Sequence, residues 1–246
     1  MAKKEIPLQP ENFELETNTV WAFPDRGKWA THDAKYRGNW SPYIPRNIIL
    51  RYSNEGDIVL DPFVGGGTTA VEAKLTHRNF IGFDINPAAI ELTQKKCKFD
   101  FETCATTRLE VADARLLPLE DCSVDLICAH PPYADIIHYS DGLNGDLSLL
   151  SYNDFLREIK YVAQQFYRVL KYGKFCAILM GDTRKKGMVQ PLAFETMNQF
   201  KLTGFKLKEI IIKEQHNCKA TGYWKTNSIR YNFLLLAHEY LFVFKK

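Results

Sequence analysis

The stretch DIVLDPFVGGGTTAVEAKLTHRNFIGFD, residues 57–84, decides the fold. It begins with a short apolar run that ends at Asp61, turns through three successive glycines and continues as a helical segment, Thr69–Leu75. A second apolar run follows at 79–84. Two short apolar runs on either side of a helical segment are typical of a strand–helix–strand unit, whose strands are parallel in one sheet. The stretch therefore predicts an α/β protein.

The same alternation continues through the rest of the chain. We expect a helix that begins at Pro87, and an amphipathic helix over 151–171 that Ser151 caps and Gly173 stops. The other predicted elements are a helix at 191–203 and strands at 107–112, 123–129, 174–180, 206–214 and 232–245. This order favours a Rossmann-like fold with a mainly parallel seven-stranded sheet and helices on both faces.

Length and composition limit the kind of protein. The 246 residues fit a single domain, 1–246, in which we interpret 1–45 as an N-terminal extension. The net charge of +3 is too small to show a nucleic-acid partner. The six cysteines form no CxxC pair or zinc-type cluster, and no apolar run suits a signal peptide or a membrane span. We therefore expect a cytoplasmic protein with reduced thiols, no metal site and no membrane contact.

Polar residues stand at the ends of four predicted strands. Ligands of parallel sheets bind at the carboxyl ends of the strands, which here carry Asp61, Asp84, Asp113 and His130. The intervening glycine turn, 65–67, opens a helix with free N–H groups, but it lacks the lysine of a P-loop and the third glycine of a dinucleotide fold. Asp84 is placed to bind a ribose or to cap the next helix, and Asp113 to bind an adenine amino group or to form a turn.

The tetrapeptide His130-Pro131-Pro132-Tyr133 follows a buried strand and carries the chemistry. The two prolines fix an extended backbone in which the Pro131 carbonyl is free to accept a hydrogen bond. With an acceptor side chain before it and the Tyr133 ring stacked on a base, this backbone would clamp a planar amino group. Two acceptors would localise the nitrogen lone pair for attack on an electrophilic methyl group. The alternative is that His130 only packs and Pro131 acts alone.

Both motifs resemble those of the amino-methylating DNA methyltransferases, which modify N6 of adenine or N4 of cytosine. Residues 61–69, DPFVGGGTT, resemble the family's DPFxGSGTT, and residues 130–133 resemble its Asp/Asn/Ser-Pro-Pro-Tyr. Segments 82–87 and 111–118 match the usual intervening sequence, so the resemblance covers about 35–182. It implies the fold of the S-adenosylmethionine-dependent methyltransferases, and a prokaryotic or phage enzyme that methylates DNA at a specific site, as in restriction-modification.

The resemblance also implies roles for individual residues. Trp40–Pro45 stands where the family has a further cofactor segment. The methionine part of S-adenosylmethionine would lie against Asp61, Pro62, Phe63, Gly65, Gly66, Gly67 and Thr68. The nucleoside part would lie against Asp84 and Ile85 at the ribose and Asp113 and Ala114 at the adenine. His130, Pro131, Pro132 and Tyr133 would form the catalytic clamp.

Two positions depart from the family pattern. Gly66 replaces a serine, and His130 replaces Asp, Asn or Ser, which leaves the choice between adenine and cytosine open. A neutral histidine accepts a hydrogen bond through one ring nitrogen, whereas a protonated one does not. We therefore expect activity to fall as the pH drops through the pKa of His130.

A base inside a duplex must be flipped out to reach such a clamp. The long connection 134–150 is a candidate DNA-contacting lid or an ordinary surface loop. A second candidate DNA-contacting loop is 213–231, and a basic run begins at Arg184. Their charged side chains suit contacts with phosphates, and the rings in the loop suit stacking on bases. The candidate residues are Arg184, Lys185, Lys186, Lys219, Tyr223, Trp224 and Lys225. The alternative is that these charged side chains form an ordinary solvated surface.

Three ways of recognising DNA and two alternative functions stay open. Because the fold uses most of the residues, we expect DNA recognition through short loops, a homodimer or a partner recognition subunit. A guanine-N2 tRNA methyltransferase is one alternative function, since such enzymes pair similar motifs. A catalytically degenerate methyltransferase fold that serves as a binding subunit is the other.

Overall fold

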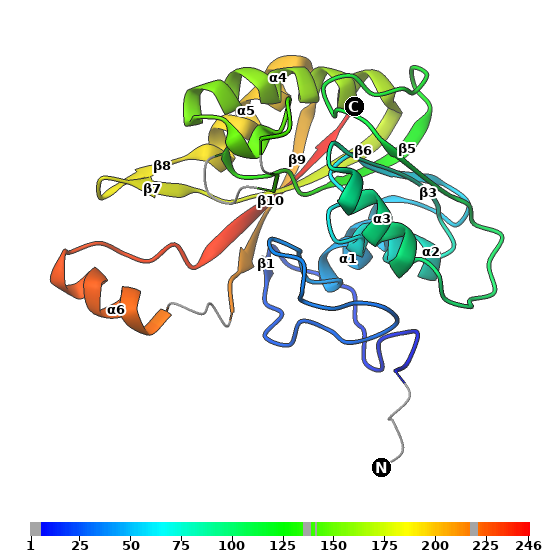
Figure 1. Ribbon diagram of the computed structural model, residues 1–246, viewed down its shortest axis with the longest axis horizontal. Coiled ribbons are helices and arrows are strands. Elements are labelled where there is room, and N and C mark those ends of the chain that lie inside the picture. The colour runs from blue at the N-terminus through cyan, green and yellow to red at the C-terminus, as the bar shows by residue number, and fades with distance from the viewer. Residues whose placement is uncertain (1–5, 135–138, 141, 217–220) are drawn as a thin grey trace, which may run out of the picture.

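One twisted sheet runs through the computed structural model, which describes residues 6–134, 139–140, 142–216 and 221–246 (Figure 1). In spatial order its strands are β1 (Val20–Trp21), β9 (Lys206–Glu214), β10 (His238–Lys245), β6 (Leu170–Met180), β5 (Val124–Ala129), β2 (Ile58–Asp61), β3 (Asn79–Asp84) and β4 (Thr107–Val111). Only β10 is antiparallel to its neighbours. The predicted mainly parallel sheet of seven strands is confirmed, and the two-residue β1 extends one edge of it.

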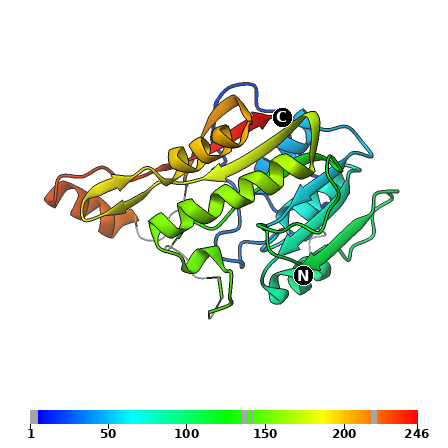
Figure 2. The ribbon, with the colours of Figure 1, turned by 90° about the horizontal axis from the view of Figure 1, so that it is seen from above.

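Helices cover both faces of this sheet (Figure 2). One face carries α1 (Tyr43–Tyr52), α2 (Thr68–Leu75) and α3 (Pro87–Lys96), and the other carries α4 (Tyr152–Val169) and α5 (Leu192–Thr203). Alternate residues of the central strand β5 feed the two cores, with Leu126 and Cys128 on the first face and Ile127 and Ala129 on the second. A strand buried on both sides explains the continuous apolar run in the sequence.

Several element boundaries differ from the prediction by one or two residues, and the larger differences are at the end of α4 and in the C-terminal region. Ser151 does cap α4 by accepting from the Asp154 N–H, but Gly173 does not stop that helix. Helix α4 ends at Val169 and passes directly into β6, where Gly173 takes a left-handed φ of 76° and its N–H donates to the Lys246 carbonyl. The last strand begins at 238 rather than 232, and part of the predicted loop 213–231 is helix α6 (Thr221–Arg230).

Two segments project from the same end of the molecule and form what we call the arm, residues 183–190 and 221–237 (Figure 1). The first is a hairpin of β7 (Thr183–Lys185) and β8 (Met188–Gln190), and the second contains α6. The Arg184 guanidinium ties them together, because it donates to the Leu234 carbonyl at 2.9 Å and lies 5.4 Å from the centre of the Phe233 ring. None of the helices in the described residues has the length and apolar character that a bilayer crossing requires.

A buried carboxylate fixes the N-terminal segment onto the helices. Glu72 of α2 is fully buried, and its Oε1 lies 2.7 Å from both Trp29 Nε1 and His32 Nε2. Its Oε2 accepts from Arg46 Nη1 of α1 at 2.8 Å. Because unpaired buried charges are costly, these contacts hold the segment in one position.

We predict that Glu72→Ala lowers the free energy of unfolding by about 3–5 kcal/mol, since it leaves the Arg46 charge buried without its partner. Urea unfolding followed by circular dichroism measures the change. Glu110→Ala, which removes an exposed ion pair with Arg108, is the control and should have a much smaller effect. Equal losses in the two variants would contradict the assignment.

Candidate functional site

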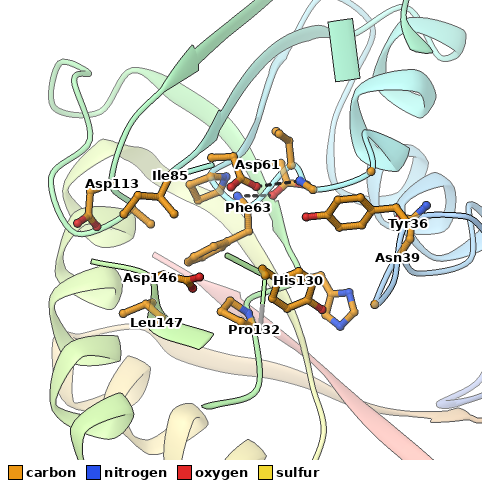
Figure 3. A pocket seen from close by; sticks show the side chains of 18 of the residues that line it. Tyr36, Asn39, Asp61, Phe63, Ile85, Asp113, His130, Pro132, Asp146 and Leu147 are labelled. Atoms are coloured by element: carbon orange, nitrogen blue, oxygen red, sulfur yellow. Dashed lines mark hydrogen bonds between the residues drawn. The ribbon is translucent and has the colours of Figure 1, made fainter. Parts of the chain in front are cut away.

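The carboxyl ends of β2, β3 and β5 and the turn after β4 surround one cavity (Figure 3). We call it the first cavity. It is lined by nine of the residues predicted to bind the cofactor: Asp61, Pro62, Phe63, Gly65, Gly66, Asp84, Ile85, Asp113 and Ala114. Two others, Gly67 and Thr68, do not line it. The four strand ends that the sequence singled out therefore meet at one site.

The glycine turn is packed against the N-terminal segment of the chain. Gly65 and Gly67 have positive φ angles of 45° and 78°. A Cβ on Gly66 would lie 2.9 Å from Tyr36 Cβ and 3.0 Å from Asn39 Nδ2. The Thr68 hydroxyl, buried behind the turn, donates to Asn39 Oδ1 at 2.5 Å. The turn thus needs glycine for close contact with the protein itself, and Thr68 supports the cavity wall from behind.

Two acids of the first cavity are held by backbone donors. Asp61 accepts from the Phe63 N–H at 3.0 Å and from the Thr69 hydroxyl at 2.5 Å, and burial raises the pKa of its carboxyl to about 7. Asp84 accepts from the Gly65 N–H at 3.0 Å and the Asn86 N–H at 2.9 Å, and burial raises its pKa as well. Each Asp84 oxygen keeps a lone pair for a further donor, such as a hydroxyl group.

Asp113 has a different environment. Its carboxylate is paired with Arg115, whose Nη2 lies 2.6 Å from Oδ2, and Arg115 also pairs with Glu158 of α4. The pair fixes the orientation of Asp113 at the rim of the first cavity. An adenine group would meet a carboxylate that already has a cationic partner.

The connection 134–150 also contributes to the first cavity, through Tyr139, Gly145, Asp146 and Leu147. The Tyr139 ring stacks on Tyr36, with centroids 6.1 Å apart and planes 15° apart, and its carbonyl accepts from Asn86 Nδ2 at 3.0 Å. Residues 135–138 and 141 lie outside the described residues. The described part of this candidate DNA-contacting lid or surface loop therefore lines the first cavity, which the sequence did not indicate.

A second cavity adjoins the first and shares Gly38, Asn39, Trp40, His130 and Tyr139 with it. The tetrapeptide stands between the two, since His130 and Pro132 line the first cavity and His130, Pro131 and Tyr133 line the second. The second cavity also contains two cationic side chains, Arg26 and Lys213. The tetrapeptide is therefore part of the wall of both cavities.

His130 is enclosed by rings and by a chain of hydrogen bonds. Trp40 stacks on its imidazole, with centroids 5.3 Å apart. Its Nε2 lies 2.8 Å from Tyr133 Oη, which donates to Glu239 Oε1 at 2.7 Å, and Glu239 pairs with Lys213 at 2.8 Å. Burial lowers the pKa of His130 to about 4, although Glu239 acts in the opposite direction. His130 is therefore neutral near pH 7.

Comparison with known families identifies the site. The chain matches the family described as DNA methylase (N6_N4_Mtase) over residues 2–95 and 124–246, which is most of its length. It belongs to the DNA methylase family. A second family, described as RMKL-like methyltransferase domain, matches residues 49–174. The resemblance that the two motifs predicted is confirmed.

Curated relatives of this DNA methylase are similar over shorter stretches. The type II methyltransferase M2.DpnII of Streptococcus pneumoniae is 41% identical over 76 residues, which are 31% of this chain and 27% of the relative. The DNA adenine methyltransferase YhdJ of Escherichia coli K12 is 39% identical over 87 residues, which are 35% of this chain and 29% of the relative. The chain thus aligns with less than a third of the length of these relatives.

Solved structures agree on the fold. An S-adenosylmethionine-dependent methyltransferase from Methanosarcina mazei matches 81% of this chain and 96% of its own, with a TM-score of 0.57 and 16% identity. TrmN from Thermus thermophilus matches 85% of this chain and 50% of its own, with a TM-score of 0.56 and 21% identity. The predicted Rossmann-like methyltransferase fold is therefore confirmed.

The basic residues predicted to contact nucleic acid lie on the arm of the methylase. Lys185 and Lys186 are exposed at the tip of the hairpin beside Arg184. On α6, Tyr223 is 70% and Trp224 49% exposed, and Lys225 is exposed beside them. Lys219 lies outside the described residues. The structure thus brings these residues together on the arm, and their role stays a prediction.

We predict that Gly66→Ala raises the dissociation constant for S-adenosylmethionine about tenfold, because its Cβ would displace Tyr36 and Asn39 from the cavity wall. Isothermal titration calorimetry measures the constant. Gly222→Ala is the matched control, since a Cβ there meets nothing within 4 Å. Unchanged affinity in Gly66→Ala would show that the turn tolerates the added methyl group.

Proposed function

We propose that this DNA methylase transfers a methyl group from S-adenosylmethionine to the exocyclic amino group of a flipped-out base in DNA. The observation that carries the proposal is the position of the tetrapeptide between two adjoining cavities. The first cavity holds the acids and the glycine turn that suit the cofactor. The second would receive the base, so that its amino nitrogen faces the methyl group past His130 and Pro132.

The first cavity suits the parts of S-adenosylmethionine in order along its wall. The turn 61–66 would hold the methionine part, and the free lone pairs of Asp84 would accept the ribose hydroxyls. Ile85 and Ala114 would pack against the adenine, with Asp113 at its amino group. The cofactor supplies the activated methyl group, and the chain positions it.

The clamp would work by hydrogen bonding to the amino group. The Pro131 carbonyl and the neutral His130 ring would each accept one amino hydrogen, which concentrates the nitrogen lone pair on the side of the methyl group. A charged histidine would lose its acceptor nitrogen. Burial of His130 would therefore preserve a hydrogen-bond acceptor where the family motif has Asp, Asn or Ser.

We predict a pH–rate profile without a histidine inflection between roughly pH 5.5 and 8. The pKa of His130 is lowered from 6.5 to about 4, so the ring is protonated, and the acceptor lost, only as the pH falls toward 4. Initial rates of methyl transfer across this range measure the profile. An inflection near 6.5 that disappears in His130→Asn would contradict the prediction.

The arm is the surface that we propose for contact with DNA. Residues 183–190 and 221–237 carry five basic and no acidic side chains, namely Arg184, Lys185, Lys186, Lys225 and Arg230. Such charges suit phosphates, and the exposed Tyr223 and Trp224 rings suit stacking. If a second copy or a separate recognition subunit binds the DNA instead, arm variants would keep their DNA affinity.

We predict that Lys185→Ala, Lys186→Ala and Lys225→Ala each raise KM for DNA and leave KM for S-adenosylmethionine unchanged. Each lost phosphate contact should reduce the slope of log affinity against log salt by about 0.9. Fluorescence anisotropy with labelled duplex DNA at several salt concentrations measures the slope. Lys201→Ala, an exposed lysine of α5, is the control.

The decisive test is transfer of labelled methyl groups to unmethylated DNA or to tRNA. Label in DNA supports the proposal, and mass spectrometry of the nucleosides then names adenine or cytosine. Label in tRNA alone would favour an RNA methyltransferase. Binding of the cofactor without transfer would favour a degenerate binding subunit.

A further inference from the structure

A relay of four side chains from three parts of the sheet edge ends at the imidazole of His130. Lys213 belongs to β9 and Glu239 to β10, and Glu239 joins Lys213 to the Tyr133 hydroxyl of the tetrapeptide. The contacts run Lys213 Nζ to Glu239 Oε2 at 2.8 Å, Glu239 Oε1 to Tyr133 Oη at 2.7 Å and Tyr133 Oη to His130 Nε2 at 2.8 Å.

The number of protons in this relay determines their positions. Glu239 lies against the Lys213 ammonium, and a charged carboxylate only accepts hydrogen bonds. The single hydroxyl hydrogen of Tyr133 must therefore point to Glu239. Tyr133 Oη is then an acceptor toward His130, so Nε2 must carry the hydrogen. A neutral imidazole carries only one, which leaves Nδ1 unprotonated.

The charges around the relay agree with this count. Burial disfavours the charge on Glu239, but Lys213 and the hydrogen bonds from its partners hold its pKa below the usual value. Burial lowers the pKa of His130 and so keeps the ring neutral. Lys213 and Arg26 lower this pKa further, whereas Glu239 raises it. Tyr133 keeps its proton, because burial raises its pKa well above the usual value.

Nδ1 of histidine occupies the same covalent position as the acceptor oxygen of Asp or Asn, two of the residues that the family motif has in place of His130. It is bonded to Cγ, as is Oδ1 of Asp or Asn, whereas Nε2 lies one bond further out. The hydrogen bond of the His130 ring involves Nε2, and no described residue forms one with Nδ1. His130 lines both cavities. Among the described residues the Nδ1 lone pair has no partner, and in the covalent structure it corresponds to the carboxylate or amide oxygen of the family motif.

We propose that Glu239 and Tyr133 are positioning residues that fix His130 in the Nε2–H tautomer, so that Nδ1 accepts a hydrogen bond from the target amino group. The inference rests on the proposed function. Tautomer selection matters because the other neutral form presents an N–H at this position, which would repel an amino group rather than orient it. No bond forms or breaks at His130 in this role.

The test combines tautomer measurement with kinetics. Nitrogen-15 NMR of the histidine ring in the wild-type protein should show the hydrogen on Nε2 of His130. In Glu239→Gln the amide can donate to Tyr133 Oη, so the hydroxyl can turn toward Nε2 and the ring hydrogen moves to Nδ1. Tyr133→Phe removes the relay and keeps the aromatic ring. We expect both variants to lose about 10²-fold in kcat while KM for S-adenosylmethionine stays unchanged.

Two comparisons separate positioning from general damage. Asparagine accepts a hydrogen bond without a tautomer, so Glu239→Gln should have little further effect on kcat in the His130→Asn background. Glu72→Gln also alters a buried carboxylate next to a histidine, and it should leave the His130 tautomer unchanged.

An Nδ1–H signal in the wild-type protein would overturn the inference, and so would equal kcat losses from Glu239→Gln in both backgrounds. Failure of the proposed function is seen separately, as a wild-type protein that methylates no DNA. In that case the NMR measurement still decides which nitrogen carries the hydrogen.

Discussion

The parallel register of β5, β2, β3 and β4 is the constraint on which the site depends. Leu60 of β2 lies opposite Ile127 of β5, and Asp61 lies opposite Gly82 of β3, so these strands finish at one edge of the sheet. The turns that follow these four strands therefore begin side by side at that edge. Because side chains alternate along a strand, a shift of one residue would turn Asp61 away from the cavity. The position of the candidate site is therefore a direct consequence of strand pairing.

The sheet edge supplies only part of the two cavities, and the N-terminal segment supplies the rest. Tyr36, Asn39 and Trp40 reach the glycine turn and the tetrapeptide from a segment without regular structure. Such a segment needs anchors, and the buried Glu72 provides two of them through Trp29 and His32. The glycines at 65 and 66 then serve the protein as much as a ligand, because a larger residue would push the segment away. The turn and the segment depend on each other.

Much of the fold could be predicted from the sequence because its signals are local. Strands 79–84 and 206–214 have the predicted bounds, and the four strand-end residues gather as parallel pairing requires. Glu239 could not be found in this way, since it is 106 residues from Tyr133 in the sequence and looks like an ordinary polar position in the last strand. Tyr36 and Tyr139 meet by the same long-range packing. Gly173 resembled a helix stop, but the strand itself takes the left-handed turn.

The relay also bears on the two interpretations of His130, as a packing residue or as an acceptor. A residue that only packs needs shape and apolar contact, which the stacked Trp40 already provides. Burying the ion pair of Glu239 and Lys213 beside it costs desolvation energy that well-packed apolar side chains would avoid. An arrangement that retains these charges, with the tyrosine hydroxyl between them and the ring, controls where the imidazole hydrogen lies. Histidine has two ring nitrogens where aspartate has equivalent oxygens, so a histidine acceptor requires such control and an aspartate does not.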